Sequence, residues 1–236
     1  MKLTLRKKPV NATVIAGFPG YGLVGTIATK FLIEHLDCER IGSIESDRFL
    51  PLAAIHKKHL IGPVEIFYNK KFNLIILQTL SQVGKLEWQI SNLLVNMAKN
   101  IKAKELIILE GTQGLGKTKI YGYTSGGDLA KFGLEPLQEG VLMGVTATLL
   151  LKAKKNVPVS CIFAESKSQL PDTEAAAEII KILDNYLGMN VDYKPLMATA
   201  KQFESKLKEM MTKQTKVSNE GFPGYKEEKN DMDYLG

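Results

Sequence analysis

The sequence contains little cysteine. Of its 236 residues only Cys38 and Cys161 are cysteine, and they lie far apart with no C-x-x-C spacing. This pattern argues against a disulfide framework or a zinc ribbon, and it predicts two buried thiols.

Long hydrophobic runs are also missing. The apolar stretch LMGVTATLLL at 142–151 is much shorter than the roughly 20 residues that a membrane-spanning helix needs. Near the N-terminus, the charges and Pro9 of KLTLRKKPV interrupt any run long enough for a secretion signal. We therefore expect a cytoplasmic protein with no membrane partner.

No block of one charge stands out in the chain. The net charge is +6, but the lysines are scattered along the sequence and interrupted by glutamates. A nucleic-acid-binding domain would gather its basic residues on one patch or stripe, so we expect no nucleic-acid partner. With 44% hydrophobic residues the chain is long enough to bury a substantial core.

The regular part of the sequence alternates short β-rich runs with helical patterns. Buried strands are expected at 12–17, 71–80, 104–110 and 157–164, and helices near 21–36 and 86–100. This order predicts an α/β fold, with a Rossmann-like, mostly parallel sheet and helices on both faces, as one core domain over residues 1–190. Turn residues between 45 and 71 favour an antiparallel excursion there.

Helix signals are clearest near the C-terminal end of that domain. Asp172 is a plausible N-cap and Gly188 a plausible stop for a helix between them. Beyond it, a second amphipathic helix is predicted over 191–213, with an apolar seam that would pack on a partner helix: Leu196, Ala200, Phe203, Leu207 and Met210. Residues 214–236 are polar, and we expect a flexible tail.

The pentapeptide GFPGY occurs at 17–21 and again at 221–225. In the first copy, Pro19 and Gly20 are expected to form a tight turn that presents Phe18 and Tyr21 beside the start of a helix. Gly20 also begins a G-x-G-x-x-G match, completed by Gly22 and Gly25. A dinucleotide site and close packing of a helix on the sheet both explain these glycines, and we favour packing because Phe18 and Pro19 lengthen the turn.

The stretch GTQGLGKT at 111–118 matches the phosphate-binding P-loop in full, with Gly111, Gly116, Lys117 and Thr118 at the defining positions. A P-loop requires a helix that starts at the Lys-Thr pair and directs its free N–H groups at phosphate. The glycine-rich residues that follow would form a poor helix. We keep a nucleotide loop as an alternative and expect no cofactor.

Other catalytic or metal-binding patterns are weak. His56 and His59 in HKKH could form a metal pair, but no third ligand lies near them in the sequence, so no metal is expected. No G-x-S-x-G nucleophile motif occurs, and no residue is assigned a catalytic role.

Three segments together resemble the archaeal proteasome-assembly-chaperone family: GFPGYGLVGTIATKFL, GTQG after a buried strand, and PLQEGVLMGVTATLLL. The resemblance covers about residues 10–190. It implies a Rossmann-like domain that self-associates and binds the proteasome core particle or its α subunits. Some members of the family do so through a C-terminal tail of hydrophobic-tyrosine-any type, and some have been described as ATP-grasp enzymes.

The resemblance makes Tyr234 the expected anchor of a docking tail, together with Leu235 and Gly236. The tail departs from the family pattern, because Tyr234 is third from the end and follows Asp233. A solubilising tail without a partner is the alternative.

The second GFPGY copy lies in the same polar tail. Phe222 and Tyr225 are two aromatics in a stretch with few apolar residues, and we interpret them as a short motif that docks on a partner such as a neighbouring subunit.

Taken together, these patterns predict a non-enzymatic, chaperone-like protein. We expect a homo-oligomer, with a heteromer containing a paralogue as a variant of the same idea. Two alternatives remain open: an ATP-dependent enzyme of the ATP-grasp or P-loop type, and an oligomeric scaffold with no proteasome contact.

Overall fold

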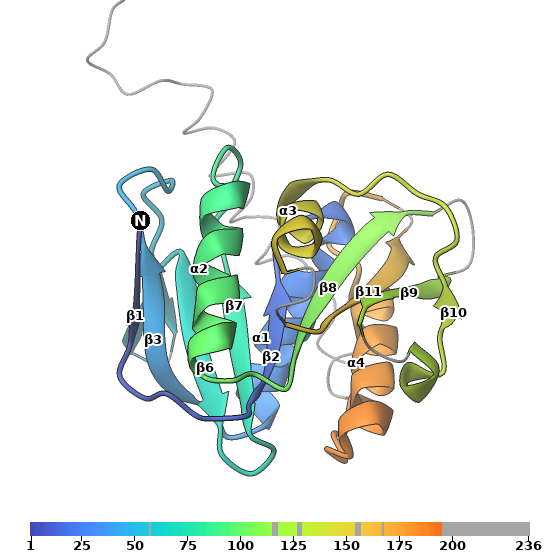
Figure 1. Cartoon of the computed structure of the whole chain (residues 1–236), viewed down its shortest axis with the longest axis horizontal. Coiled ribbons are helices and arrows are strands. Elements are labelled where there is room, and N and C mark those ends of the chain that lie inside the picture. The colour runs from blue at the N-terminus through green and yellow to red at the C-terminus, as the bar shows by residue number, and fades with distance from the viewer. Residues whose placement is uncertain (57, 115–117, 127–128, 154–156, 167, 195–236) are drawn as a thin grey trace, which may run out of the picture.

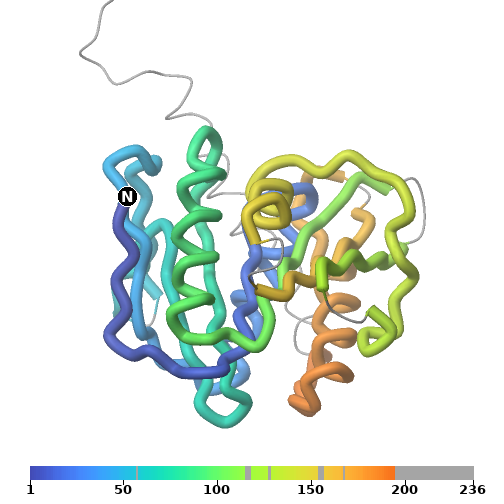
Figure 2. The backbone as a smooth tube through the Cα atoms, viewed as in Figure 1, coloured from blue at the N-terminus to red at the C-terminus, as the bar shows by residue number. Residues whose placement is uncertain are grey.

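The protein is built on one nine-stranded sheet with helices on both faces (Figures 1 and 2). The computed structural model describes residues 1–56, 58–114, 118–126, 129–153, 157–166 and 168–194. Across the sheet, the strands are β1 (Lys2–Leu5), β3 (Glu39–Glu45), β6 (Val64–Asn69), β7 (Leu74–Thr79), β2 (Thr13–Gly17), β8 (Glu105–Gln113), β11 (Val159–Ser166), β9 (Ile120–Ser125) and β10 (Glu135–Pro136).

The sheet is mixed, so the prediction of a mostly parallel Rossmann-like sheet is wrong in that respect. Parallel pairing joins β7, β2, β8 and β11 at the centre, and it joins β9 to β10 at one edge. The pairs β1–β3, β3–β6, β6–β7 and β11–β9 are antiparallel. The connection between β6 and β7 is too short for the crossover that parallel strands require.

Two helices cover each face of the sheet, as the alternating pattern predicted. The helices α1 (Val24–His35) and α4 (Thr173–Leu187) pack together on one face, and α2 (Glu87–Asn100) and α3 (Gly144–Ala153) pack on the other (Figure 1). The central strands are buried on both faces because successive side chains alternate between two apolar cores. Ile15, for example, pairs with Ile76 on one side and Ile107 on the other, all toward α1 and α4.

The sequence signals for α4 are confirmed in detail. The Asp172 carboxylate accepts a hydrogen bond from the Ala175 N–H at 3.0 Å, which satisfies one of the free donors at the helix start. Gly188 ends the helix with a left-handed φ of 63°. Of the second helix predicted over 191–213, residues 191–193 are not helical, and its apolar seam lies outside the described residues.

The predicted antiparallel excursion is also present. Between β3 and β6 the chain forms a separate two-stranded hairpin of β4 (Ala54–His56) and β5 (His59–Ile61). His56 of this hairpin lies 3.5 Å from Glu34, so the hairpin is close to the C-terminal end of α1. Both cysteines are free thiols: Cys161 is buried, whereas Cys38 is only partly so. Burial raises the pKa of the Cys38 thiol to about 12. Within the described ranges, no helix is long and apolar enough to cross a membrane.

Candidate functional site

The first glycine motif forms a compact turn between β2 and α1. A short 3-10 helix (Tyr21–Leu23) leads into α1, and Gly22 adopts a left-handed φ of 63° within it. The Leu23 N–H donates to the Gly20 carbonyl at 3.1 Å, which closes the turn. Phe18, Pro19 and Tyr21 are half-buried, and Gly20 is exposed.

Glycines of β2, α1 and β8 form one tightly packed group around this turn, called the glycine seam below. A Cβ on Gly17 would lie 2.1 Å from the Gly25 carbonyl oxygen, and a Cβ on Gly25 would lie 2.3 Å from the Leu109 carbonyl oxygen. Similarly, a Cβ on Gly111 would lie 1.9 Å from the Tyr21 carbonyl oxygen. These separations are far below van der Waals contact, so each position requires the absence of a side chain.

The seam occupies the place where an α/β sheet commonly binds its ligand. The chain leaves β2 toward β3 on one side and leaves β8 toward β11 on the other, so the switch point lies between the carboxyl ends of β2 and β8. Here the main chain of the turn packs directly on β8. The two glycine motifs that resemble nucleotide fingerprints thus contact each other at the carboxyl ends of β2 and β8.

The P-loop match does not lead into a helix. Gly111 belongs to β8, Gly116 and Lys117 lie outside the described residues, and Thr118 lies two positions before the start of β9. Since β9 pairs antiparallel with β11, the segment after Thr118 continues as a strand. The N–H groups and dipole that a helix would direct at phosphate are therefore not supplied at this position. The Thr118 hydroxyl is buried and makes no hydrogen bond.

A buried carboxyl group lies near the end of β8, on the α3 face. Burial raises the pKa of Glu110, and an interaction with the Thr146 side chain of α3 partly offsets that increase. One of its carboxylate oxygens, Oε2, is buried without a hydrogen-bond partner. Burial and the Glu110 charge together raise the pKa of Cys161, so this thiol stays protonated and unreactive.

A second buried carboxyl group lies on the opposite face and is fully satisfied. Glu105 accepts hydrogen bonds from the hydroxyls of Ser160 and Tyr186, and the Lys131 ammonium lies 3.9 Å from it. Burial, followed by the Glu105 interaction, raises the pKa of the Tyr186 phenol. This network ties α4 to β8 and β11, and its closed set of partners indicates a structural role.

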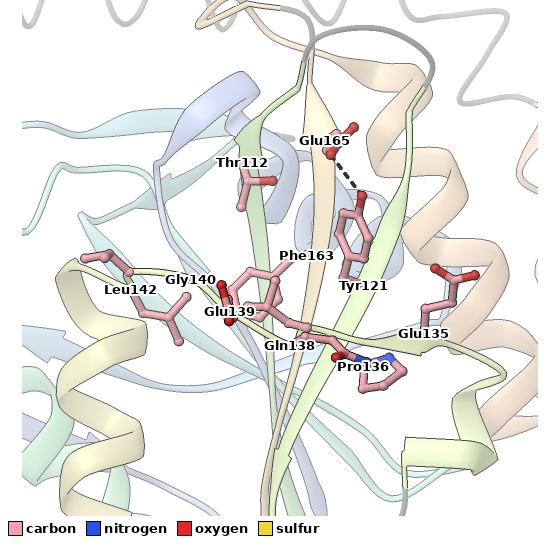
Figure 3. Close-up of a pocket in the computed structure, with 12 residues that line it drawn as sticks. Thr112, Tyr121, Glu135, Pro136, Gln138, Glu139, Gly140, Leu142, Phe163 and Glu165 are labelled. Atoms are coloured by element: carbon pink, nitrogen blue, oxygen red, sulfur yellow. Dashed lines mark hydrogen bonds between the residues drawn. The ribbon is translucent and has the colours of Figure 1, made fainter.

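A cavity lies farther toward the β9–β10 edge, with a volume of about 650 Å³ (Figure 3). Tyr121, Phe163 and Glu165 come from β9 and β11, and the remaining wall is formed chiefly by residues 135–142. Acidic groups come from Glu135, Glu139 and Glu165, whereas Phe163, Pro136, Leu137, Val141 and Leu142 supply apolar surface. Among the lining residues there is no lysine or arginine.

The polar groups of this cavity are connected through Tyr121. Its hydroxyl donates to a Glu165 carboxylate oxygen at 3.1 Å, as the dashed line in Figure 3 marks. Burial raises the pKa of Tyr121, and the nearby charges of Glu165 and Glu135 raise it further. No ion pair between described residues includes Glu135, Glu139 or Glu165. The cavity therefore combines an apolar wall with carboxylates that form no ion pair with any described lysine, arginine or histidine.

Sequence reasoning missed this cavity. Its carboxylates are separated along the chain and fit no spacing motif, and only the pairing of β9 with β11 brings Tyr121 beside Phe163. The segment PLQEG at 136–140 begins one of the three family-like segments, but its sequence does not indicate that it lines a cavity.

The remaining predicted site residues are not brought together with these. His56 and His59 face each other across the β4–β5 hairpin, and His56 lies 3.5 Å from Glu34. No group of three or more His, Cys, Asp or Glu side chains in the described part of the chain could hold a metal ion. The tail residues Phe222, Tyr225, Tyr234, Leu235 and Gly236 lie outside the described residues.

The mixed sheet and its two helical layers define a class of α/β proteins that known structures share. The crystal structure of Pyrococcus furiosus PbaA, an archaeal homologue of proteasome-assembly chaperone, superimposes with a TM-score of 0.80 at 28% identity, covering 89% of this chain and 95% of that one. Pyrococcus furiosus PbaB, an archaeal proteasome activator, shares the fold at 21% identity and a TM-score of 0.73, covering 89% of this chain and 98% of that one.

Sequence comparison identifies the family. The profile of the PAC2 family matches residues 14–211, and the chain belongs to that family. An uncharacterized protein of Methanocaldococcus jannaschii is 29% identical over 91% of this chain and 93% of its own length. The resemblance to proteasome-assembly chaperones seen in the sequence is thereby confirmed at the level of family and fold.

Proposed function

We propose that this protein is a non-enzymatic partner of the proteasome that self-associates and binds the core particle or its free α subunits. The observation that carries the proposal is the similarity to PbaA, an archaeal homologue of proteasome-assembly chaperone. This similarity extends over nearly all of both chains. Membership of the PAC2 family supports the same assignment.

The described residues favour binding over catalysis. At the carboxyl ends of the central strands, where an enzyme of this architecture would place its substrate, the backbone at Gly25 and Gly111 packs closely on neighbouring carbonyl groups. The P-loop alternative would need a helix after Thr118, and a strand follows instead. Neither feature favours an ATP-grasp or P-loop enzyme.

The tail is the proposed contact with the core particle. An aromatic ring near a free carboxylate can enter an apolar slot between two subunits while a lysine at the rim pairs with the carboxylate. Tyr234 is the anchor in this scheme, and Leu235 and Gly236 complete the segment. Phe222 and Tyr225 provide a second docking point on a neighbouring subunit.

The proposal is tested by titrating the full-length protein against the 20S core particle and against free α subunits, with light scattering and pull-down as readouts. We expect binding that is independent of ATP and magnesium, and that weakens at least tenfold in Tyr234→Ala because interface aromatics are common hot spots. Lys229→Ala, a charge removed from the same tail, is the matched control and should bind as the original chain does.

Each possible result of this titration tests a different part of the proposal. Binding that survives deletion of residues 219–236 would refute the role of the tail and leave the partner in place. Absence of binding to both the core particle and α subunits would refute the proposed function. Heat released on titration with ATP, and lost in Lys117→Ala, would replace it with the nucleotide alternative.

A further inference from the structure

The β4–β5 hairpin is an exposed element whose chemistry complements the acidic cavity. Ile55 and Leu60 are a directly opposed cross-strand pair, and they are 80% and 65% exposed. Lys58 lies at the hairpin tip, between His56 and His59, and all three are exposed. Two large apolar side chains therefore accompany a cationic tip.

An isolated hairpin of this size gains little from its own contacts. It has only three residue pairs and does not belong to the nine-stranded sheet. Two-stranded hairpins are at best marginally stable in water unless another surface packs on them. The contact between His56 and Glu34 of α1 holds one side of this hairpin, whereas the Ile55–Leu60 pair remains open to solvent.

The cavity near β9 and β10 offers the opposite combination. Glu135 and Glu139 are exposed, Glu165 lies deeper beside Tyr121, and Val141 is an apolar wall residue that is 89% exposed. Lys119 pairs with Glu165 through the backbone, since its carbonyl accepts the Glu165 N–H at 2.9 Å, but the two side chains form no ion pair. Carboxylates beside apolar surface suit an occupant that carries both a cation and aliphatic side chains.

We propose that the β4–β5 hairpin of one copy docks on the acidic cavity of a second copy of this chain. Lys58 then lies against the carboxylates of Glu135 and Glu139, and the Ile55–Leu60 pair covers the apolar wall. The inference deepens the self-association in the proposed function and rests on it, because it names the two surfaces that meet.

The position of the surfaces fixes the type of contact. The hairpin connects β3 and β6, near one edge of the sheet, whereas the cavity lies beside β9 and β10 at the other edge (Figure 1). Since different surfaces of the two copies meet, the contact is head-to-tail. Repeating such a contact gives a closed ring, or an open filament if the rotation does not close.

A charge-swap experiment tests this contact, with sedimentation velocity over a concentration series of the full-length chain as readout. Lys58→Glu should weaken self-association at least tenfold, and so should Glu135→Lys combined with Glu139→Lys. The chain that carries all three substitutions should regain association to within about threefold of the original, because the charges are complementary again. Lys70→Glu, another exposed lysine outside both surfaces, is the control and should change nothing.

Ile55→Ser independently tests the contribution of the apolar Ile55–Leu60 pair to the contact. It should weaken association without lowering thermal stability, because the side chain is mostly exposed.

Several outcomes would overturn the inference. These are a chain that is monomeric at every concentration, an oligomer that is indifferent to Lys58→Glu, and charge swaps that do not rescue each other. Capture of spermidine by the cavity with no effect of the hairpin variants on mass would assign it to a small cation instead. Binding of each variant to the core particle is measured in parallel. If a variant loses self-association but still binds the core particle, the hairpin–cavity contact can be judged separately from binding to the proteasome.

Discussion

The strands at the centre of the sheet and the strands near its β9–β10 edge have different surroundings at their ends. At the centre, the turn after β2 packs its backbone onto β8, and the positions of Gly17, Gly25 and Gly111 leave no room for a side chain. At the edge, β9 and β11 carry Tyr121 and Glu165 into an open cavity with residues 135–142 around it. This fold commonly binds small molecules at the carboxyl ends of its central strands, whereas the cavity of Figure 3 lies near the β9–β10 edge.

Breaking the seam should have the largest effect. We expect Gly111→Ala to lower the free energy of unfolding by about 3 kcal/mol, because the new methyl group meets the Tyr21 carbonyl, which belongs to backbone that cannot easily move. Urea denaturation of the full-length chain measures this change.

The matched control for the seam is Gly84→Ala. Nothing lies within 4 Å of a Cβ built at that position, so its effect should stay within about 0.5 kcal/mol. Equal and small effects of both substitutions would mean that the seam is not close-packed. Gly111→Ala that abolishes ATP binding at unchanged stability would instead support a nucleotide loop.

The outer side of the seam should be less sensitive. Asp172 caps α4, and its backbone N–H also donates to the Gly22 carbonyl at 2.8 Å. Asp172→Ala removes only the side-chain cap, so we expect a loss of about 1 kcal/mol in the free energy of unfolding. Asp172→Asn, which preserves an oxygen acceptor, should lose much less. An equal loss in both variants would assign the effect to the charge rather than to the cap.

The elements of the fold could be read from the sequence where local rules decide. The buried strands and the caps of α4 follow from apolar runs and from Asp172 and Gly188, and they are confirmed. The direction of β9 could not be read, because its antiparallel pairing with β11 joins segments that are far apart in the sequence.

The same distinction applies to the candidate sites. Glycine spacing identified two segments that meet at the centre, but spacing alone could not show that they meet each other, since Gly111 and Tyr21 are 90 positions apart in sequence. The acidic cavity gave no local signal, because a strand pairing assembles it from separate segments. A motif therefore predicts a site only together with the element that follows it.

Glu110 allows the buried centre of the sheet to be compared with the open edge, because it lies near the end of β8 and interacts with Thr146 of α3. Burial raises its pKa above the ordinary value of 4.5, so the folded protein holds this proton more tightly than the unfolded chain does. The associated stability is present in full below the ordinary value and is lost as pH rises through the raised pKa. We expect this to be the smallest effect, because the Thr146 interaction offsets part of the shift.

The measurement is the free energy of unfolding from pH 4 to pH 8 for the original chain and for Glu110→Gln, which cannot ionise. The original chain should lose stability relative to the variant as the pH rises, because only its buried group must ionise in the folded state. Glu139→Gln, at an exposed glutamate of the cavity, should leave that difference unchanged. Parallel curves for the original chain and Glu110→Gln would place the Glu110 carboxylate in contact with water and extend the open edge toward the centre of the sheet.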